Sequence, residues 1–349
     1  MIGAGAAGFA CAAALDARGL GVVVIDKGRG VGGRASSKRL DPREVGPGGP
    51  GAADLGAQYL TARSDAMRAR LDRLARTGAA AVWPARVVQI DARGERTPEP
   101  PRTDDDARWV GVPSMGAMMR SLWGTASDRV SIRVGIELAP LVGERGPWSL
   151  VDTAGEPIGT FDRVVVTTPA PQAARLLATA SPELASRLTQ AELAPCIAAL
   201  LELDPSFDPG FDAARLEGDP VAWLARESSK PGRASSGLWV AHASESFSRA
   251  HVDAPPERVA EALAAHVATA LHAQSPRVVL AHRWRYARVV RTLAGDGGSF
   301  LIHPEHGLAV AGDAFAGARL EGAFESGRQL GEALADALGG ARGAPDRSP

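Results

Sequence analysis

The sequence contains few cysteines, few lysines and no long apolar run. The first and the last of these shortages each exclude a class of protein. Its two cysteines, Cys11 and Cys196, are too few for a disulfide framework in 349 residues, so we expect a reducing, cytoplasmic location. Without an apolar run of about 18 residues, no membrane-spanning helix is predicted. The net charge of −1 gives no electrostatic reason to expect a nucleic acid or an anionic membrane as a partner.

Arginine carries nearly all of the positive charge, since only three of the 39 basic residues are lysine. An isolated arginine is therefore weak evidence for a site. The histidines and carboxylates show no metal-ligand spacing, and the Gly-x-Ser-x-Gly elbow of serine hydrolases is missing. We predict neither a metal site nor a hydrolase of that type.

The chain opens with MIGAGAAGFACAAALDARGLGVVVID, a glycine pattern that is typical of dinucleotide-binding folds. Gly3 makes a tight turn, Gly5 lets a pyrophosphate approach the backbone, and Gly8 lets the following helix pack closely on the sheet. A buried strand over residues 22–25 ends at Asp26, whose carboxylate can accept a hydrogen bond from a ribose hydroxyl. No arginine follows this acid directly, which disfavours NADP here and leaves NAD and FAD open.

Hydrophobic periodicity predicts α/β segments at both ends of the chain and strand-rich segments between them. Helices are predicted over residues 9–18, 64–77 with Ser64 as N-cap, 114–123, 183–193, 256–271 and 322–338. Strands are predicted over residues 22–25, 130–135, 139–143, 148–152, 161–168, 196–204, 221–226, 237–243 and 278–284, and in LAVAGDAF. Residues 43–53 and 94–107 are predicted to be loops.

The residues after Asp26 distinguish between NAD and FAD. A second glycine pair, Gly32 and Gly33, is expected near the pyrophosphate, and Arg34 is expected to reach a phosphate oxygen. The whole stretch 3–34 resembles the fingerprint of FAD enzymes in the glutathione reductase/amine oxidase superfamily. The resemblance implies that FAD is bound, and we expect it to be noncovalent.

A second cofactor element lies near the C-terminus, in AVAGDAFAGARLEGAFESG. A strand there ends at Gly312 and Asp313, and a helix begins near Gly322. In the superfamily that this segment resembles, the aspartate binds the ribityl or pyrophosphate end of FAD. The helix N-terminus faces the pyrimidine side of the flavin, where it stabilises the negative charge of the reduced ring.

Two further segments resemble cofactor contacts of the superfamily. ADLGAQYLT resembles the segment that runs past the isoalloxazine, and GIELAPLV resembles the strand whose backbone contacts the adenine. The complete set of cofactor-binding residues that we predict is Gly3, Gly5, Ala7, Gly8, Asp26, Lys27, Gly33, Arg34, Gly56, Ala57, Gln58, Leu138, Gly312, Asp313, Glu321, Gly322 and Ala323.

The resemblance predicts an α/β protein with two parts. One is a Rossmann-like FAD-binding domain of the glutathione reductase/amine oxidase type, and the other is a discontinuous α+β substrate domain built on an antiparallel sheet. We assign residues 1–62, 110–172 and 292–340 to the FAD-binding domain. Residues 63–109 and 173–291 form the predicted substrate domain, and 341–349 a disordered tail.

Motifs spread over the whole chain resemble one branch, the renalase-like FAD oxidases. They are DKGRGVGGR, DLGAQYLT, WLARESSKPGR, WVAHASESFSRAHV, HRWRYA and GDAFAGARLEGAFESG. The resemblance implies oxidation of the 2- and 6-dihydro isomers of NAD(P)H. In that reaction a hydride passes to flavin N5, and O2 then reoxidises the flavin, which gives NAD(P)+ and hydrogen peroxide. The partners expected are therefore a dihydronicotinamide dinucleotide and O2.

The main alternative is a flavin amine oxidase or a desaturase, and a flavin-binding protein without turnover is the other. Amine oxidases typically hold the flavin through a cysteine in the C-terminal third and surround the amine with aromatic rings. This chain has no cysteine after Cys196 and only two tyrosines, Tyr59 and Tyr286. Arg319 occupies the position of a cage tyrosine, where it either suits an anionic substrate or pairs with a surface carboxylate.

Hydride transfer from a dihydropyridine needs no strong base, because no N–H or O–H proton has to leave. We therefore expect a site of aromatic and hydrogen-bonding groups that orient the donor carbon. The substrate-lining candidates are Gln58, Trp239, His242, His282, Trp284, Tyr286 and Arg319, and a core role is the alternative for each tryptophan. Ser228, Ser229 and Lys230 form a predicted turn that contacts either a substrate phosphate or solvent.

The first strand of the sheet is too short in this sequence, because only Met1 and Ile2 precede the first glycine. The resembling enzymes have about five buried residues there. Loss of a central strand should destabilise a parallel sheet severely. We therefore expect that the native protein contains residues upstream of Met1.

Overall fold

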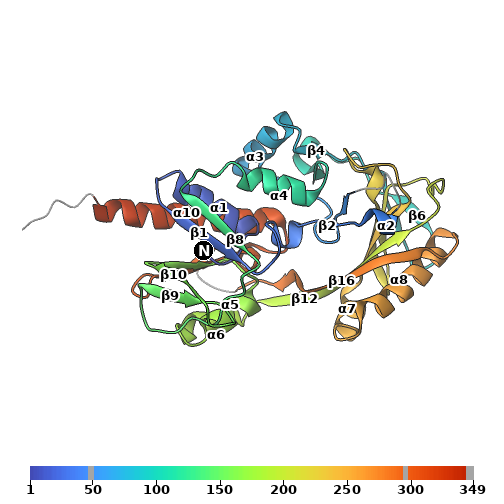
Figure 1. The fold of residues 1–349 in the computed structure, drawn as a ribbon. Coiled ribbons are helices and arrows are strands. Elements are labelled where there is room, and N and C mark those ends of the chain that lie inside the picture. Colours follow the sequence, from blue (N-terminus) through green and yellow to red (C-terminus); the bar gives the residue numbers. More distant parts are fainter. Residues whose placement is uncertain (46–50, 294–297, 343–349) are drawn as a thin grey trace, which may run out of the picture. The chain divides into compact units, whose positions relative to one another are not determined.

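The computed structural model describes residues 1–45, 51–293 and 298–342, and these form two compact units (Figure 1). Unit 1 comprises Met1–Gly33, Leu122–Glu192 and Val289–Pro349, and unit 2 comprises Arg34–Ser121 and Leu193–Arg288. The predicted domains have different boundaries. Residues 34–62 and 110–121 belong to unit 2, because their backbone pairs with it. For example, Leu60 N–H donates to the carbonyl of Trp109 at 2.8 Å.

Unit 1 contains the predicted parallel sheet. Strand β1 (Val22–Asp26) pairs in parallel with β8 (Val130–Val134). Strand β11 (Val164–Val166) pairs in parallel with β18 (Leu308–Ala311), and β17 (Phe300–His303) is antiparallel to β18. These strands are apolar because the inner ones are covered on both faces.

Met1 and Ile2 lie where the first strand would run. Among the described residues, Met1 bonds only to β1, where its carbonyl accepts from the N–H of Ile25 at 2.8 Å, whereas Ile2 bonds on both sides. Ile2 forms parallel bridges with Ile25 on β1 and with Val166 on β11. Its N–H donates to the carbonyl of Val165 at 2.8 Å, and the N–H of Gly3 donates to the carbonyl of Ile25 at 2.8 Å. One residue thus joins the two halves of the sheet in unit 1.

Helix α1 (Ala6–Asp16) packs against the long helix α10 (Leu320–Arg342), and the two lie side by side in Figure 1. Glycines make this close approach possible. A Cβ at Gly327 would lie 2.0 Å from the carbonyl oxygen of Ala7, and one at Gly331 would lie 2.7 Å from that of Cys11. The remaining elements of unit 1 are β9 (Trp148–Val151), β10 (Pro157–Phe161), α5 (Ala170–Leu177), α6 (Pro182–Leu188) and α9 (Asp313–Ala316).

Unit 2 is built on a seven-stranded sheet with the order β16-β12-β15-β14-β13-β5-β6. The strands are β16 (Arg277–Arg291), β12 (Glu192–Glu202), β15 (Leu238–Ala243), β14 (Val221–Arg226), β13 (Ala213–Leu216), β5 (Val87–Ile90) and β6 (Arg96–Pro98). Strands β12, β15, β14 and β13 are antiparallel neighbours, whereas β13 and β5 are parallel. The sheet is thus mainly antiparallel, as predicted for the substrate domain.

Helix α8 (Pro256–Leu271) covers one face of this sheet, where Val259, Leu263 and Val267 pack into a core that contains Leu201 and Trp239. A second core includes Leu40, Leu55, Leu200 and Val240. The other helices and strands of unit 2 are β2 (Lys38–Arg39), α2 (Pro42–Val45), β3 (Ala52–Ala53), α3 (Asp65–Arg76), β4 (Ala80–Val82), β7 (Trp109–Gly111), α4 (Met115–Trp123) and α7 (Glu245–Ala250). The last two residues of α4 belong to unit 1. Short 3-10 turns form at Gly33–Ala35 (on the unit boundary), Asp104–Asp106 and Glu227–Ser229.

Several predicted elements are confirmed and a few are wrong. The helix over 256–271 and the strand over 221–226 have the predicted bounds, and Ser64 Oγ caps α3 by accepting from the N–H of Met67 at 3.2 Å. No strand forms over 139–143, because Gly143 takes a φ of +118° there. The helix over 183–193 ends at Leu188 and β12 begins at Glu192.

Described parts of the two predicted loops and of the predicted tail form regular elements. Residues 94–107 contain β6, and residues 43–53 contain the end of α2 and β3. Residues 46–50 and 343–349 lie outside the described residues, while α10 extends to Arg342.

Candidate functional site

The three glycines of the opening motif have distinct structural roles in unit 1. Gly3 has a φ of +115°, which favours glycine, and a Cβ at Gly8 would lie 2.0 Å from the carbonyl oxygen of Gly3. A Cβ at Gly5 would meet nothing within 4 Å in the described residues. Gly5 therefore borders open space at the N-terminus of α1, where no described side chain caps the helix. Its free N–H groups suit a phosphate.

Asp26 connects the strand β1 to two turns around this space. Its carboxylate accepts from the N–H groups of Ala4 and Gly28, both at 2.6 Å. Each oxygen keeps a further lone pair with which a ribose hydroxyl can bond. The second glycine pair also lies here, since a Cβ at Gly33 would be 3.5 Å from the Cα of Gly5. Unit 1 thus offers a cradle that fits the ADP part of FAD.

The C-terminal element of unit 1 contains the other predicted cofactor residues. Asp313 begins α9 and Glu321 lies in the first turn of α10, and both are buried. Gly322 lies close to α9, because a Cβ there would be 2.9 Å from the carbonyl oxygen of Ala316. Ala323 follows in the same turn, whereas Arg319 directly before the helix is exposed.

Three more of the predicted cofactor residues lie in unit 1, around the cradle. Ala7 is in the first turn of α1 and is buried. Leu138 is buried and forms a bridge with Asp152. Lys27 is half exposed, with its ammonium 3.4 Å from the carboxylate of Glu137. Their roles in binding FAD stay predictions.

In unit 2 the segment 54–58 is fixed by side chains from two strands. The carbonyl of Leu55 accepts from Nε2 of His242 at 3.0 Å and from Nε1 of Trp284 at 3.1 Å. Gly56 is tightly enclosed, since a Cβ there would lie 2.0 Å from the carbonyl oxygen of Arg34. The N–H of Ala57 donates to the same carbonyl at 2.9 Å.

Five of the predicted substrate-lining residues, Gln58, His242, His282, Trp284 and Tyr286, lie in unit 2, and two of them, His242 and Trp284, bond to Leu55. His282 stands edge-on to Trp284, with ring centroids 4.3 Å apart. The carbonyl of Tyr286 accepts from the guanidinium of Arg34 at 3.3 Å. Arg34 thus bonds to strand β16, and the phosphate contact expected of it stays a prediction. Trp239 is wholly buried in the core, which makes it a packing residue.

A buried set of charges lies beside Gln58. We call it the Lys230 cluster, and its members are Asp54, Glu227, Lys230 and Arg233. The Lys230 ammonium is completely buried, is paired with Glu227 and lies 3.8 Å from Asp54. It also donates to Oε1 of Gln58 at 3.2 Å. This bond defines the orientation of the amide, whose nitrogen donates to the carbonyl of Asp54.

Burial shifts the pKa of two groups here, Glu227 and His242. It raises the pKa of Glu227, while the nearby Lys230 ammonium opposes the rise. It lowers the pKa of His242 to about 4, so the imidazole is neutral and carries its proton on the Nε2 that faces Leu55. His242 is therefore a neutral donor near neutral pH, not a cation.

Three aromatic rings form an aromatic cluster next to the Lys230 cluster. Tyr59 lies between Trp83 and Trp223, with centroid distances of 6.3 and 5.8 Å. A cation of the protein stands over each ring, within the range of a cation–π interaction. The pairs are Lys230 over Trp83 (5.7 Å), Arg108 over Tyr59 (5.4 Å) and Arg215 over Trp223 (5.1 Å).

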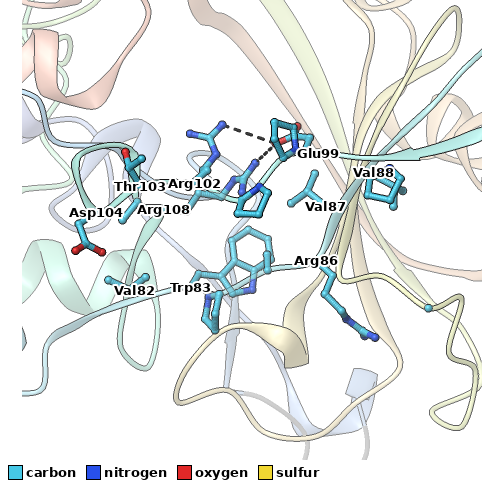
Figure 2. Close-up of a pocket in the computed structure, with 17 residues that line it drawn as sticks. Val82, Trp83, Arg86, Val87, Val88, Glu99, Arg102, Thr103, Asp104 and Arg108 are labelled. Atoms are coloured by element: carbon cyan, nitrogen blue, oxygen red, sulfur yellow. Dashed lines mark hydrogen bonds and ion pairs between the residues drawn. The ribbon is translucent and has the colours of Figure 1, made fainter.

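Trp83 also lines a cavity of about 560 Å³ within unit 2 (Figure 2). Prolines and valines make up much of the apolar wall, and the polar part includes Glu99. Figure 2 shows Arg102 and Arg108 directed toward this carboxylate. Arg215 is not among the lining residues, but its Nε also donates to Glu99, at 2.9 Å. We call Glu99 and these three arginines the Glu99 cluster.

Several of these residues were not predicted from the sequence. Glu227 and Arg233 belong to one short segment, but Asp54 lies 173 positions before Glu227, so no local pattern predicts the cluster. The turn at Ser228, Ser229 and Lys230 was expected to face a phosphate or solvent. Both interpretations are wrong for Lys230, which is buried, while Ser229 Oγ accepts from Nε1 of Trp83 at 3.2 Å.

Neither a membrane-spanning helix nor a metal-binding group of side chains is found among the described residues. No helix within them is both long and apolar enough to cross a membrane. Nor do three or more His, Cys, Asp or Glu side chains in the described ranges gather as a metal ion would require.

Comparison with family models gives two matches. Residues 1–74 match the model of an NAD(P)-binding Rossmann-like domain, and residues 102–334 match that of the flavin containing amine oxidoreductases. The second match covers most of the chain. Because the enzymes of this family contain a flavin and the Rossmann-like cradle accompanies it, FAD is the cofactor.

Solved structures show the same fold across nearly the whole chain. Putrescine oxidase bound to putrescine has a TM-score of 0.70 at 14% identity, and the match covers 97% of this chain and 98% of that one. Cyclohexylamine oxidase from Brevibacterium oxydans IH-35A has 0.68 at 12% identity, with the same coverage. An oxidoreductase from Methanosarcina mazei has 0.67 at 13%, covering 94% and 98%. At these identities the likeness concerns the fold.

Proposed function

The chain belongs to the family of flavin containing amine oxidoreductases, and from this premise we propose that it is an FAD-dependent oxidase of dihydronicotinamide dinucleotides. The substrates would be the 2- or 6-dihydro isomers of NAD(P)H. FAD, when bound, supplies a hydride acceptor at N5 and passes the electrons on to O2, with NAD(P)+ and hydrogen peroxide as products. The protein's own part is to bind and orient the donor.

The aromatic cluster carries this proposal. An enzyme that binds an alkylammonium ion uses open aromatic faces or a carboxylate to attract the positive charge. Here each of the three rings already holds a cation of the protein. Another ammonium ion would meet repulsion from Lys230, Arg108 and Arg215. A neutral dihydropyridine with anionic phosphates attached to it is a better match for these charges.

The remaining groups fit a reaction without a base. His242 is neutral and donates to Leu55, and Gln58 is oriented by Lys230. Both are hydrogen-bonding groups fixed by other bonds, so they can orient a carboxamide without taking a proton from it. Trp284 provides an indole next to them whose N–H is also bonded, at 3.1 Å from the carbonyl oxygen of Leu55.

Oxidation of an amine is the second candidate, and the family match and the names of the similar structures favour it. Putrescine oxidase and cyclohexylamine oxidase share the fold over almost the whole chain. The test is anaerobic reduction of the FAD-loaded protein, followed by the flavin absorbance. We expect bleaching by 2- or 6-dihydro-NAD(P)H, recovery in air and one hydrogen peroxide per substrate.

The same experiment separates the alternatives. Putrescine and cyclohexylamine serve as the amine arm, and 4-dihydro-NAD(P)H as the matched nicotinamide control. Bleaching by the amines alone would overturn the proposal in favour of amine oxidation. FAD-loaded protein that none of these compounds reduces would contradict both candidates and favour a flavin-binding protein without turnover.

A further inference from the structure

The cavity beside Trp83 has the size and the charge of a ligand site. Its volume of about 560 Å³ lies in the range of small-molecule sites, roughly 300–1,000 Å³. All of its lining residues belong to unit 2. They include the apolar Val87 and Val88 and the polar Arg102 and Arg108 (Figure 2).

The Glu99 cluster carries excess positive charge. The guanidiniums of Arg102, Arg108 and Arg215 surround Glu99, and the only other described carboxylate paired with them is that of Asp106, 2.7 Å from Arg102. Three cations thus face two anions in this cluster. The cavity wall also carries Asp104 and Arg86, and Arg86 is paired with Asp212. Burial raises the pKa of Glu99, but hydrogen bonds from Arg215 and Arg108 outweigh it and leave the pKa below its usual range, so Glu99 is an anion.

One donor in this cluster has no acceptor. The side chain of Arg108 is 5% exposed, and its Nε is buried without a hydrogen-bond partner among the described residues. A buried N–H that lacks an acceptor costs free energy, which an anionic ligand oxygen would recover. Arginine forks match phosphate oxygens particularly well.

Trp83 adds a flat apolar wall to the same cavity. It is 2% exposed, and its indole N–H is already bonded to Ser229. The indole therefore closes the apolar part of the cavity and offers a ligand neither a further donor nor an open ring face.

We propose that this cavity binds the adenosine diphosphate part of the dinucleotide substrate, with phosphates at Arg102 and Arg108. This inference rests on the proposed function, because that function supplies the dinucleotide. The reacting nicotinamide is a separate part of the same molecule, so the cavity provides affinity and selects dinucleotides over shorter donors.

The test uses FAD-loaded protein and ADP-ribose, with affinity measured by calorimetry. Arg102→Gln should weaken ADP-ribose about tenfold, since a charge-assisted bond to phosphate is lost. Arg249→Gln is the matched control, because Arg249 also forms an i,i+4 ion pair, with Glu245 at 3.0 Å, away from the cavity. Arg102→Lys keeps the charge without the fork and should recover part of the affinity.

Kinetics give the second readout. Arg102→Gln should raise KM for the dihydro-NAD isomer about tenfold and leave KM for the dihydronicotinamide riboside isomer unchanged, because the riboside lacks the phosphates. Flavin absorbance and the unfolding midpoint establish that the variant is folded.

The outcomes distinguish this inference from the proposed function. Failure of the wild-type protein to bind ADP-ribose, or equal binding by Arg102→Gln and Arg249→Gln, overturns the cavity assignment, even if dihydronicotinamides bleach the flavin. Arg102-dependent binding of ADP-ribose without any oxidation of dihydronicotinamides supports the cavity assignment and overturns the proposed function.

Discussion

The two units solve the problem of building a site in different ways. Unit 1 uses glycines, which have no side chain: its cradle depends on Gly3, Gly5 and Gly8, and on hydrogen bonds from backbone N–H groups to Asp26. Unit 2 uses large and charged side chains, which it buries together around Gln58. The first kind of site depends on steric space and the second on electrostatic balance.

This difference predicts different sensitivities to mutation. A cradle of glycines tolerates changes of charge but not of volume. A buried cluster of four charges tolerates small changes of shape better than the loss of one partner, because the remaining charge is left without compensation. Substitutions at three places, namely Lys230, the glycine cradle and His242, test this contrast, and they are taken from the largest expected effect to the smallest.

The largest effect is expected for Lys230→Met. The substitution keeps the length of the side chain and removes the cation paired with Glu227, while Arg233 stays paired with Asp54. One buried carboxylate is then uncompensated, which should lower the free energy of unfolding by about 4 kcal/mol. Lys27→Met is the control, since Lys27 and Glu137 form an exposed pair in unit 1 that should contribute about 0.5 kcal/mol. Urea unfolding measures both.

A double variant makes the interpretation specific. Lys230→Met combined with Glu227→Gln removes one charge of each sign, so it should regain part of the lost free energy. If the double variant is less stable than the sum of the single effects, the charges of unit 2 do not balance one another as argued.

The same contrast explains which parts of the molecule could be predicted from sequence. The cradle is local: its glycines, α1 and Asp26 lie within 26 consecutive residues, and each glycine has a steric role that a pattern reveals. The bounds of α8 follow from periodicity over 16 residues. Such features need no knowledge of the rest of the chain.

The chemistry of unit 2 is not local. Lys230 is joined to Gln58 and Asp54 across more than 170 positions of sequence, and its charge gave no sign that it would be buried. Lysine is almost never fully buried unless it is paired. The resemblance that pointed to Gln58 located this region, but only the folded chain shows which charges surround it.

An intermediate effect is expected at the cradle, where Gly8→Ala and Gly5→Ala should differ. The new Cβ at position 8 would overlap the carbonyl oxygen of Gly3, so Gly8→Ala should cost about 3 kcal/mol of stability in urea unfolding. Position 5 has room for a Cβ in the described residues, and Gly5→Ala should keep its stability. It should nevertheless bind FAD about tenfold more weakly, because the methyl group stands where the pyrophosphate approaches.

Fluorescence titration of the apoprotein with FAD measures this second effect. Equal stabilities of the two alanine variants would contradict the steric assignment of Gly8. Unchanged FAD affinity of Gly5→Ala would show that the open space at the start of α1 is not the phosphate position.

The smallest effect concerns pH and His242. Burial lowers its pKa to about 4, compared with an ordinary value near 6.5, so the unfolded chain takes up the proton first. The stability that the neutral imidazole contributes is complete above pH 6.5 and is lost as the pH falls toward 4. By pH 5 the loss should be about 2 kcal/mol.

His242→Gln should flatten the stability profile between pH 6.5 and 5, because glutamine can donate to Leu55 and does not titrate. His272→Asn is the control, since His272 is exposed and its left-handed backbone, with φ of 52°, accepts asparagine readily. Urea midpoints at several pH values give the profiles. A slope in His242→Gln as steep as that of the wild-type protein would mean that another group with a lowered pKa causes the loss. His282 of unit 2 would be the first to examine, because burial lowers its pKa as well.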